Sequence, residues 1–167
     1  MNSKRHTIVS ALKKQLRHDD SWLKKLSSNH FSLHLAIFRE PYLKFIMEGK
    51  KKIETRFAKR SCAPFEQVSD GDVVLLKKSG GEVSGICEVE KVWFYHLDPE
   101  AFAFIKKQFG KLICAVNDSF WTERECKTVA TLMLIKNVIP ISGVQIKKRD
   151  RRGWVVLQAK QEPSSFK

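Results

Sequence analysis

The sequence predicts an α+β fold, a small mixed β-barrel of five to six strands with short flanking helices. The 167 residues are 43% hydrophobic and 29% charged, which is typical of one globular domain with at most an appendage. Short stretches of alternating or continuous apolar residues recur along the chain, separated by Gly, Pro or Asp. The helical patterns between them are too few and too irregularly placed for repeated βαβ units, which favours a barrel over a doubly wound sheet.

The first thirty residues differ from the rest because their apolar residues follow a helical period. These residues, interleaved with lysines and arginines, are Ile8, Leu12, Leu16, Leu23 and Leu26. Asp19-Asp20-Ser21 marks a break and a cap for a second helix that starts near Trp22. We expect residues 1–30 to form a basic helical extension that packs on the main domain, although the same pattern would also suit a grip on RNA.

The main domain is predicted over residues 31–158, and residues 159–167 are expected to be a disordered tail. Alternating apolar residues predict its strands, while Pro41 and Asp98-Pro99 mark the starts of helices. The expected strands cover residues 33–37, 53–57, 73–76, 82–95, 129–139 and 154–157. The expected helices begin at Pro41, at Asp98 and at Asp118 or Ser119, and they end near Gly49, Gly110 and Glu125.

Positive charge is in excess and concentrated. Thirty-one Lys and Arg residues against 18 Asp and Glu residues give a net charge of +13. Residues 1–38, 39–60 and 136–167 carry +5, +5 and +6, whereas residues 61–135 carry −3. Such surfaces attract polyanions by releasing counterions, and nucleic acid is the commonest polyanion in a cytoplasm. The charge pattern therefore predicts a nucleic-acid partner.

Several classes of protein are disfavoured by what the sequence lacks. No apolar run approaches the roughly 18–20 residues of a membrane span, and no export signal is recognisable, so we expect a cytoplasmic protein that binds no membrane. The four cysteines form no C-x-x-C pair, and phosphate-loop, nucleophile-elbow and zinc-protease motifs are missing from the sequence. We therefore expect neither a metal site nor a cofactor.

The segment GKKKIETR stands out because a helix C-cap at Gly49 is followed at once by a strand with charged residues on one face. Lys52, Glu54 and Arg56 share a face there, Thr55 turns to the other, and Lys51 reaches the charged face from the preceding turn. A carboxylate between cations is held ionised, and a guanidinium can bind a phosphate or a base edge with two hydrogen bonds. The alternative is a solvated charged strand edge that opposes aggregation.

Two further features are candidates for contact with nucleic acid. Tyr95 and Trp121 could stack on bases, an interaction worth about 1–3 kcal/mol per base, although aromatic rings more often fill a core. The loop before the last expected strand holds five cations in six residues, interrupted only by Asp150. These are Lys147, Lys148, Arg149, Arg151 and Arg152. The loop is a candidate phosphate-binding site, because it is attached to a rigid strand. The alternative is a solvated loop that binds nothing.

The spacing G-x-K-x-x-E-x-R, formed by Gly49, Lys51, Glu54 and Arg56, resembles the signature of the ASCH domain, named for activating signal cointegrator-1 homology. The lead-in REPY, which begins at Arg39, also resembles the family. So do the later segments DGDV, GICEV, FW and TLMLI, so that the resemblance covers about residues 32–157.

This resemblance implies a PUA-like barrel with a cleft beside the signature, in which RNA or a modified nucleoside derived from RNA binds. It adds Arg39 to the expected binding residues Lys51, Lys52, Glu54 and Arg56.

Some family members look like amidohydrolases acting on N4-acetylcytidine, and others are similar to ribonucleases. A hydrolase in the same cleft is therefore the alternative, with Lys51, Glu54 and the more distant Glu123 as catalytic candidates and Glu100 as a second choice for the last. The amidohydrolase branch has Thr where this sequence has Glu54. Because Thr55 faces away, we expect weak or no deacetylation.

Overall fold

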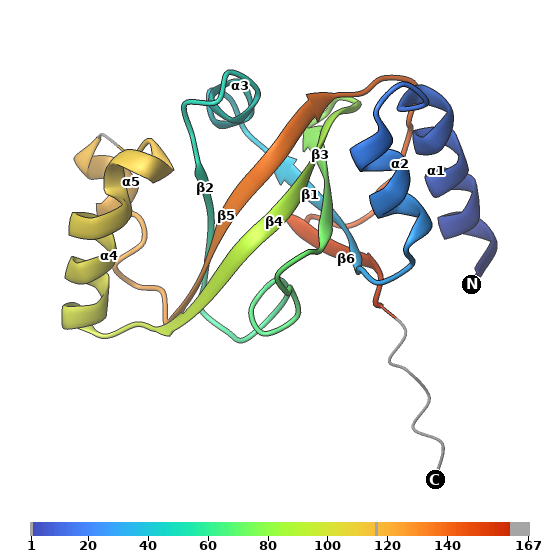
Figure 1. Ribbon diagram of the computed structural model, residues 1–167. Helices are drawn as coiled ribbons and strands as arrows, with labels where there is room; N and C mark the ends of the chain where they lie inside the picture. The colour runs from blue at the N-terminus through green and yellow to red at the C-terminus, as the bar shows by residue number, and fades with distance from the viewer. Residues whose placement is uncertain (1, 116, 161–167) are drawn as a thin grey trace, which may run out of the picture.

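Residues 2–115 and 117–160 are described by the structure, a computed structural model, and most of the expected tail lies outside this range. Six strands form one mixed sheet in the order β2-β5-β4-β3-β1-β6, in which β1 and β3 are parallel and the other neighbours antiparallel. The sheet curls into a half-barrel (Figure 1). The strands are β1 (Leu33–Phe38), β2 (Ile53–Ala58), β3 (Val73–Lys78), β4 (Val83–His96), β5 (Val129–Pro140) and β6 (Trp154–Gln158). The predicted fold class is confirmed.

In the described residues, five short helices flank the sheet: α1 (Asn2–Gln15), α2 (Asp20–Ser27), α3 (Tyr42–Met47), α4 (Pro99–Ile113) and α5 (Asp118–Thr122). Asp19 caps α2 and Asp98 caps α4, each through its side-chain oxygen, as their positions predict. Helix α4 continues past Gly110, where the sequence predicted its end, because the fully buried Ile113 extends the inward face of the helix by one turn. No described helix is long and apolar enough to cross a membrane.

Strand alternation divides the core into three clusters. One face of the curled sheet encloses the inner cluster, which contains Phe38, Leu76 and Trp154. The other face is covered at one end by α1 and α2 and at the other end by α4 and α5 (Figure 1). The curled sheet therefore has a covered back and a front that opens beside β2.

The two N-terminal helices are packed against the sheet. Leu12, Leu16, Trp22 and Leu26 are buried in the same cluster as Leu33 of β1. The helical period of the first thirty residues therefore serves packing. Lys14 and Lys24 are exposed, whereas Lys25 is partly buried and forms an ion pair with Glu88 at 3.3 Å.

A buried polar network fixes the start of the half-barrel. The ring of His34 on β1 pairs with the Asp72 carboxylate at 3.0 Å, and Trp154 at the start of β6 donates its indole N–H to the other ring nitrogen at 3.2 Å. Asp72 also accepts hydrogen bonds from the backbone N–H groups of Ser32 and Ser69, each at 2.8 Å. These contacts join β1, β3 and β6 and give His34 a structural role.

Candidate nucleic-acid interface

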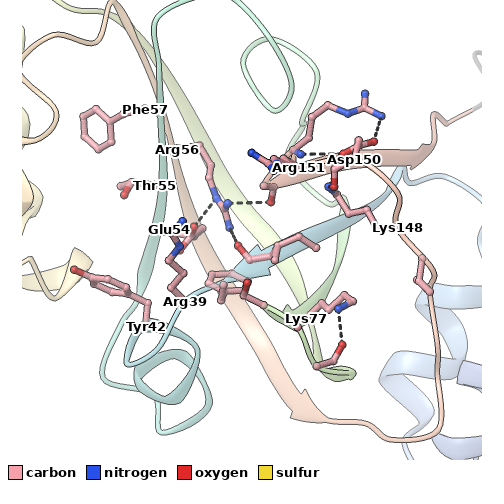
Figure 2. A pocket seen from close by; sticks show the side chains of 18 of the residues that line it. Arg39, Tyr42, Glu54, Thr55, Arg56, Phe57, Lys77, Lys148, Asp150 and Arg151 are labelled. Atoms are coloured by element: carbon pink, nitrogen blue, oxygen red, sulfur yellow. Dashed lines mark hydrogen bonds and ion pairs between the residues drawn. The ribbon is translucent and has the colours of Figure 1, made fainter.

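A cleft of about 1300 Å³ opens along the front of the half-barrel. Its walls come from β2, the end of β1, α3, the region of α5, the β3–β4 hairpin and the loop before β6 (Figure 2). Among the described residues, eleven cationic side chains line it against four carboxylates. The cations are Arg39, Lys51, Arg56, Lys77, Arg124, Lys127, Lys147, Lys148, Arg149, Arg151 and Arg152, and the carboxylates are Glu54, Glu82, Glu123 and Asp150.

Glu54 lies at the floor of the cleft between two cations. It is only 6% exposed, and strand β2 places it opposite Met133 of β5. One carboxylate oxygen accepts a hydrogen bond from Arg56 Nε at 2.8 Å, and the other lies 3.5 Å from Lys51 Nζ. Glu54 is therefore an ordered acceptor that holds both cations in place.

Lys51 is the most buried cation of the site, at 3% exposure. Its ammonium group donates to the backbone carbonyl of Ile113, at the end of α4, at 2.9 Å and lies 5.6 Å from the centre of the Tyr42 ring. Burial lowers the pKa of Lys51, and the neighbouring Glu54 carboxylate opposes this shift. A lysine in this environment can bind an electron-rich group and is closer to releasing its proton than a solvated lysine.

Arg56 closes the gap between the two edge strands of the curled sheet. Strands β2 and β6 stand at opposite ends of the strand order and form no ladder with each other. From β2, the Arg56 guanidinium donates to the carbonyl of Gly153, just before β6, at 3.0 Å and to the carbonyl of Ile37 on β1 at 3.1 Å. It also lies over the rings of Phe38 and Trp154, at 5.0 and 5.4 Å. Its main role is structural, because three of its donors serve the protein itself.

The predicted alternation of β2 is present, but its charged face is internal. Figure 2 shows Glu54 and Arg56 on one side of the strand and Thr55 with Phe57 on the other. The idea of a solvated strand edge is wrong for Glu54, because the sheet curls its charged face inward. Thr55 faces away from Glu54 as expected, yet it still borders the cleft, which reaches around this edge strand.

The basic loop, defined as residues 147–152, holds two of its five cations on its own acid. Lys148 and Arg152 both pair with Asp150, and the hydrogen bond from Arg152, followed by the one from Lys148, keeps the pKa of that carboxyl well below its usual range. Lys147, Arg149 and Arg151 are exposed and line the cleft. The loop is therefore folded on Asp150 and presents these three cations to solvent.

The other predicted residues divide into those that line the cleft and those that do not. Arg39 and Glu123 line it, Glu123 with a side chain that is 75% exposed. Lys52 is exposed but does not border it. Tyr95 packs against Phe104 of α4 at 6.4 Å, behind the sheet.

Trp121 is 3% exposed and donates its indole N–H to the carbonyl of Ala115 at 3.2 Å. No ring face is left for a base, so its proposed stacking role is wrong, and the alternative that it fills the core is correct. The reason is the packing of α5, which turns Trp121 onto the rings of Phe57 and Phe102.

Among the residues that the fold brings to the cleft and that sequence reasoning missed are Tyr42, Lys77, Arg124 and Lys127. Lys77 lies near the end of β3, where the burial of the strand stops and its pairing with β4 shifts in register, so it could have been found as the polar end of an apolar strand. The segment that contains Arg124 and Lys127 reads only as a short polar turn, and nothing local indicates which way it faces. In the described part of the chain, no group of three or more His, Cys, Asp or Glu side chains is arranged to hold a metal ion.

Comparison with known proteins gives one family. The family model of the ASCH domain matches residues 37–142. The crystal structure of ASCH from Zymomonas mobilis is similar with a TM-score of 0.58 and 14% identity over 75% of this chain and 87% of that chain. A single-residue variant of the same protein gives a TM-score of 0.60 and 13% identity over 77% and 90%. Because the sequence identities are this low, the similarity to these structures shows only a common fold. No match was found among curated proteins.

Proposed function

This chain belongs to the ASCH domain family, and we propose that it binds RNA along the cationic cleft of its half-barrel. The observation that carries the proposal is the lining of the cleft, in which eleven cations face four carboxylates. Neutralising phosphates with Lys and Arg is the main source of affinity in non-specific nucleic-acid binding.

The size of the cleft favours a strand over a single small molecule. Pockets for small ligands usually measure about 300–1,000 Å³ and enclose most of the ligand. This cleft measures about 1300 Å³ and is bordered by exposed cations of the basic loop. An open cleft of this kind suits several consecutive nucleotides.

The floor of the cleft adds groups that could distinguish bases. Glu54 can only accept hydrogen bonds, whereas Lys51 only donates them. A base edge that carries both an amino group and a carbonyl group offers the complementary pattern. Glu54 and Lys51 are buried and ordered, so a base would meet them without a large cost in conformational entropy.

Fluorescence anisotropy with a labelled 12-nucleotide single-stranded RNA tests the proposal. We expect affinity to fall steeply between 50 and 200 mM salt, by about 0.7 in logarithmic slope for each phosphate contacted. Reversing all five charges of the basic loop, at Lys147, Lys148, Arg149, Arg151 and Arg152, should make the slope shallower. Binding that changes with neither salt nor charge reversal would contradict the proposal.

A second candidate, hydrolysis in the same cleft, is favoured by one observation. Lys51 lies beside a carboxylate with its pKa lowered by burial, which suits a proton-transfer residue. In contrast, no hydroxyl occupies the position of Glu54, and Thr55 faces the other side of β2 (Figure 2). We therefore expect weak or no acyl transfer to the protein.

Incubation with N4-acetylcytidine, with release of cytidine followed by chromatography, separates the two candidates. Little or no cytidine should form. Robust turnover that disappears in Lys51→Ala would replace the binding proposal with the hydrolase. Incubation of the labelled RNA under the same conditions tests for strand cleavage in parallel.

A further inference from the structure

We propose that Arg124, together with Lys127, forms a phosphate-binding subsite on the α5 side of the cleft, so that the ligand of this cleft is a phosphorylated nucleotide and not a free nucleoside. The inference rests on the proposed RNA-binding function and deepens it by naming the ligand class. Both residues lie outside the signature and outside the basic loop, and both line the cleft.

Arg124 is held in one orientation by its own turn. Its Nη1 donates to the carbonyl of Phe120 at 2.8 Å, and its guanidinium carbon lies 3.7 Å from the centre of the Phe120 ring. The ring of Phe57 is 5.9 Å away. A guanidinium stacked this closely loses little further freedom when it binds a ligand.

The remaining donors of Arg124 have no hydrogen-bond partner in the described part of the chain. Among the residues that the structure describes, its Nε and Nη2 atoms have no hydrogen-bond partner, and its ion pair with the largely exposed Glu123 is long, at 3.7 Å. An exposed pair of this length contributes little. Nε and Nη2 form the edge of a guanidinium that binds two oxygens of one phosphate.

The position of Arg124 makes these unused donors significant. Its side chain is only 27% exposed, and burial lowers its pKa, although an arginine stays charged at any physiological pH. A partly desolvated cation without a full set of acceptors costs free energy, and a bound anion would recover it. Lys127, half-buried three residues later, adds a second positive charge to the same wall.

The surroundings favour the phosphate of a nucleotide over the carboxylate of an acidic peptide. Tyr42 and Phe57 are half-buried and line the cleft, where they offer ring surface to a base. The Glu54 carboxylate at the floor can accept hydrogen bonds from the amino groups of a base, which an acidic side chain does not offer. A phosphate joined to an aromatic base therefore fits this wall better than an acidic side chain.

Competition against the labelled RNA tests the subsite. The competitors are cytidine, guanosine, their 5′- and 3′-monophosphates, inorganic phosphate and a poly-glutamate peptide, each with wild-type protein and with Arg124→Gln and Arg124→Lys. Lys107→Gln, which removes one exposed charge from α4 outside the cleft, is the matched control. Thermal melts confirm that each variant is folded.

With wild-type protein and with the Lys107 variant, we expect at least one monophosphate to compete at least tenfold better than its nucleoside. Arg124→Gln should reduce this preference to about twofold or less while nucleoside competition stays unchanged. Arg124→Lys should restore only part of it, because a point charge replaces the two-donor edge.

Three outcomes would overturn the inference. If RNA binds and the preference for monophosphates survives Arg124→Gln, the subsite is wrong while the proposed function stands. If poly-glutamate competes as well as the nucleotides, the wall binds an acidic protein segment. If wild-type protein binds no RNA and no nucleotide, the proposed function itself fails, and the subsite fails with it.

Discussion

The floor of the cleft and the basic loop both present positive charge to the same space, but they do so in opposite ways. At the floor, Lys51 is buried and Arg56 is half-buried, and both are ordered by Glu54 and bonded to backbone carbonyls of distant elements. In the basic loop, Lys147, Arg149 and Arg151 are exposed. The same residue types therefore determine the shape of the protein in one region and are free to attract a ligand in the other.

The difference shows that counting cations does not identify the binding residues. The guanidinium of Arg56 is mostly committed to closing the half-barrel, although it belongs to the family signature. Arg124 belongs to no predicted motif and keeps donors at the wall of the cleft that no described residue uses. Substitutions at the floor should change stability first, and substitutions in the basic loop should change affinity first.

The largest effect should come from removing the acid of the floor. Glu54→Ala leaves two cations without their counter-charge in a buried site, so we expect the free energy of unfolding to fall by about 3–5 kcal/mol. Glu54→Gln, which keeps the shape, should destabilise less but still lower RNA affinity per folded molecule. Urea denaturation and binding titrations on the same preparations measure both quantities.

Glu123→Ala is the matched control, because this glutamate also lines the cleft but is 75% exposed. Its stability should stay within about 0.5 kcal/mol of wild type. Equal stability of the Glu54 and Glu123 variants would show that the floor is not the structural element described above.

The next effect concerns the basic loop. Replacing Lys147, Arg149 and Arg151 by Gln should make the salt dependence of RNA binding shallower by about 2 in logarithmic slope, at about 0.7 per lost phosphate contact. Stability should hardly change, because these side chains are exposed. Salt titrations followed by fluorescence anisotropy provide the slopes.

A triple Gln variant at Lys14, Lys24 and Lys107 removes the same charge from exposed positions outside the cleft. Its slope should match that of wild type. A similar decrease of the salt slope in both triple variants would mean that RNA binding depends on the net charge of the protein alone and not on the cleft.

A smaller effect is expected at the point where Arg56 meets the chain before β6. A Cβ atom on Gly153 would lie 2.9 Å from Arg56 Nη1, which is held by hydrogen bonds and cannot move freely. We expect Gly153→Ala to cost about 1–2 kcal/mol of stability, as overpacking usually does.

The same substitution in an Arg56→Met background should cost much less, because the hydrogen-bonded guanidinium is gone. A double-mutant cycle measured by chemical denaturation provides this comparison. An additive cycle would indicate that Gly153 is required for a reason other than contact with Arg56.

The smallest effect is a dependence on pH. Burial lowers the pKa of Lys51 below its ordinary value of 10.5, so at high pH the folded state releases this proton before the unfolded state does. The unfolded state then binds more protons, and stability rises with pH between the lowered pKa and 10.5. Wild-type protein should therefore gain stability relative to Lys51→Met as the pH rises from 8 toward 10.5.

Urea denaturation of wild type and Lys51→Met across this pH range measures the difference between their free energies of unfolding. The titration of the other lysines affects both proteins equally and cancels in this difference. A difference that falls with rising pH would mean that the ion pair with Glu54 outweighs the burial of Lys51.

Local rules alone determined much of the fold. Side chains alternate along any strand, so the sequence correctly placed Glu54 and Arg56 on one face of β2 and Thr55 on the other. The caps at Asp19 and Asp98 depend on hydrogen bonds to residues three positions away, which a sequence displays directly. The same holds for the strands and for the amphipathic N-terminal helices, because each depends on short-range periodicity.

Only the tertiary structure decided which faces are buried and which charges remain free. The carbonyl partners of Arg56 lie 19 and 97 residues away, so no local pattern could show that this arginine closes the half-barrel. The packing of α5 buries Trp121 and directs Arg124 into the cleft, and neither position has a local signal. Periodicity is a property of neighbouring residues, whereas burial and charge pairing depend on which distant segments the sheet brings together when it curls.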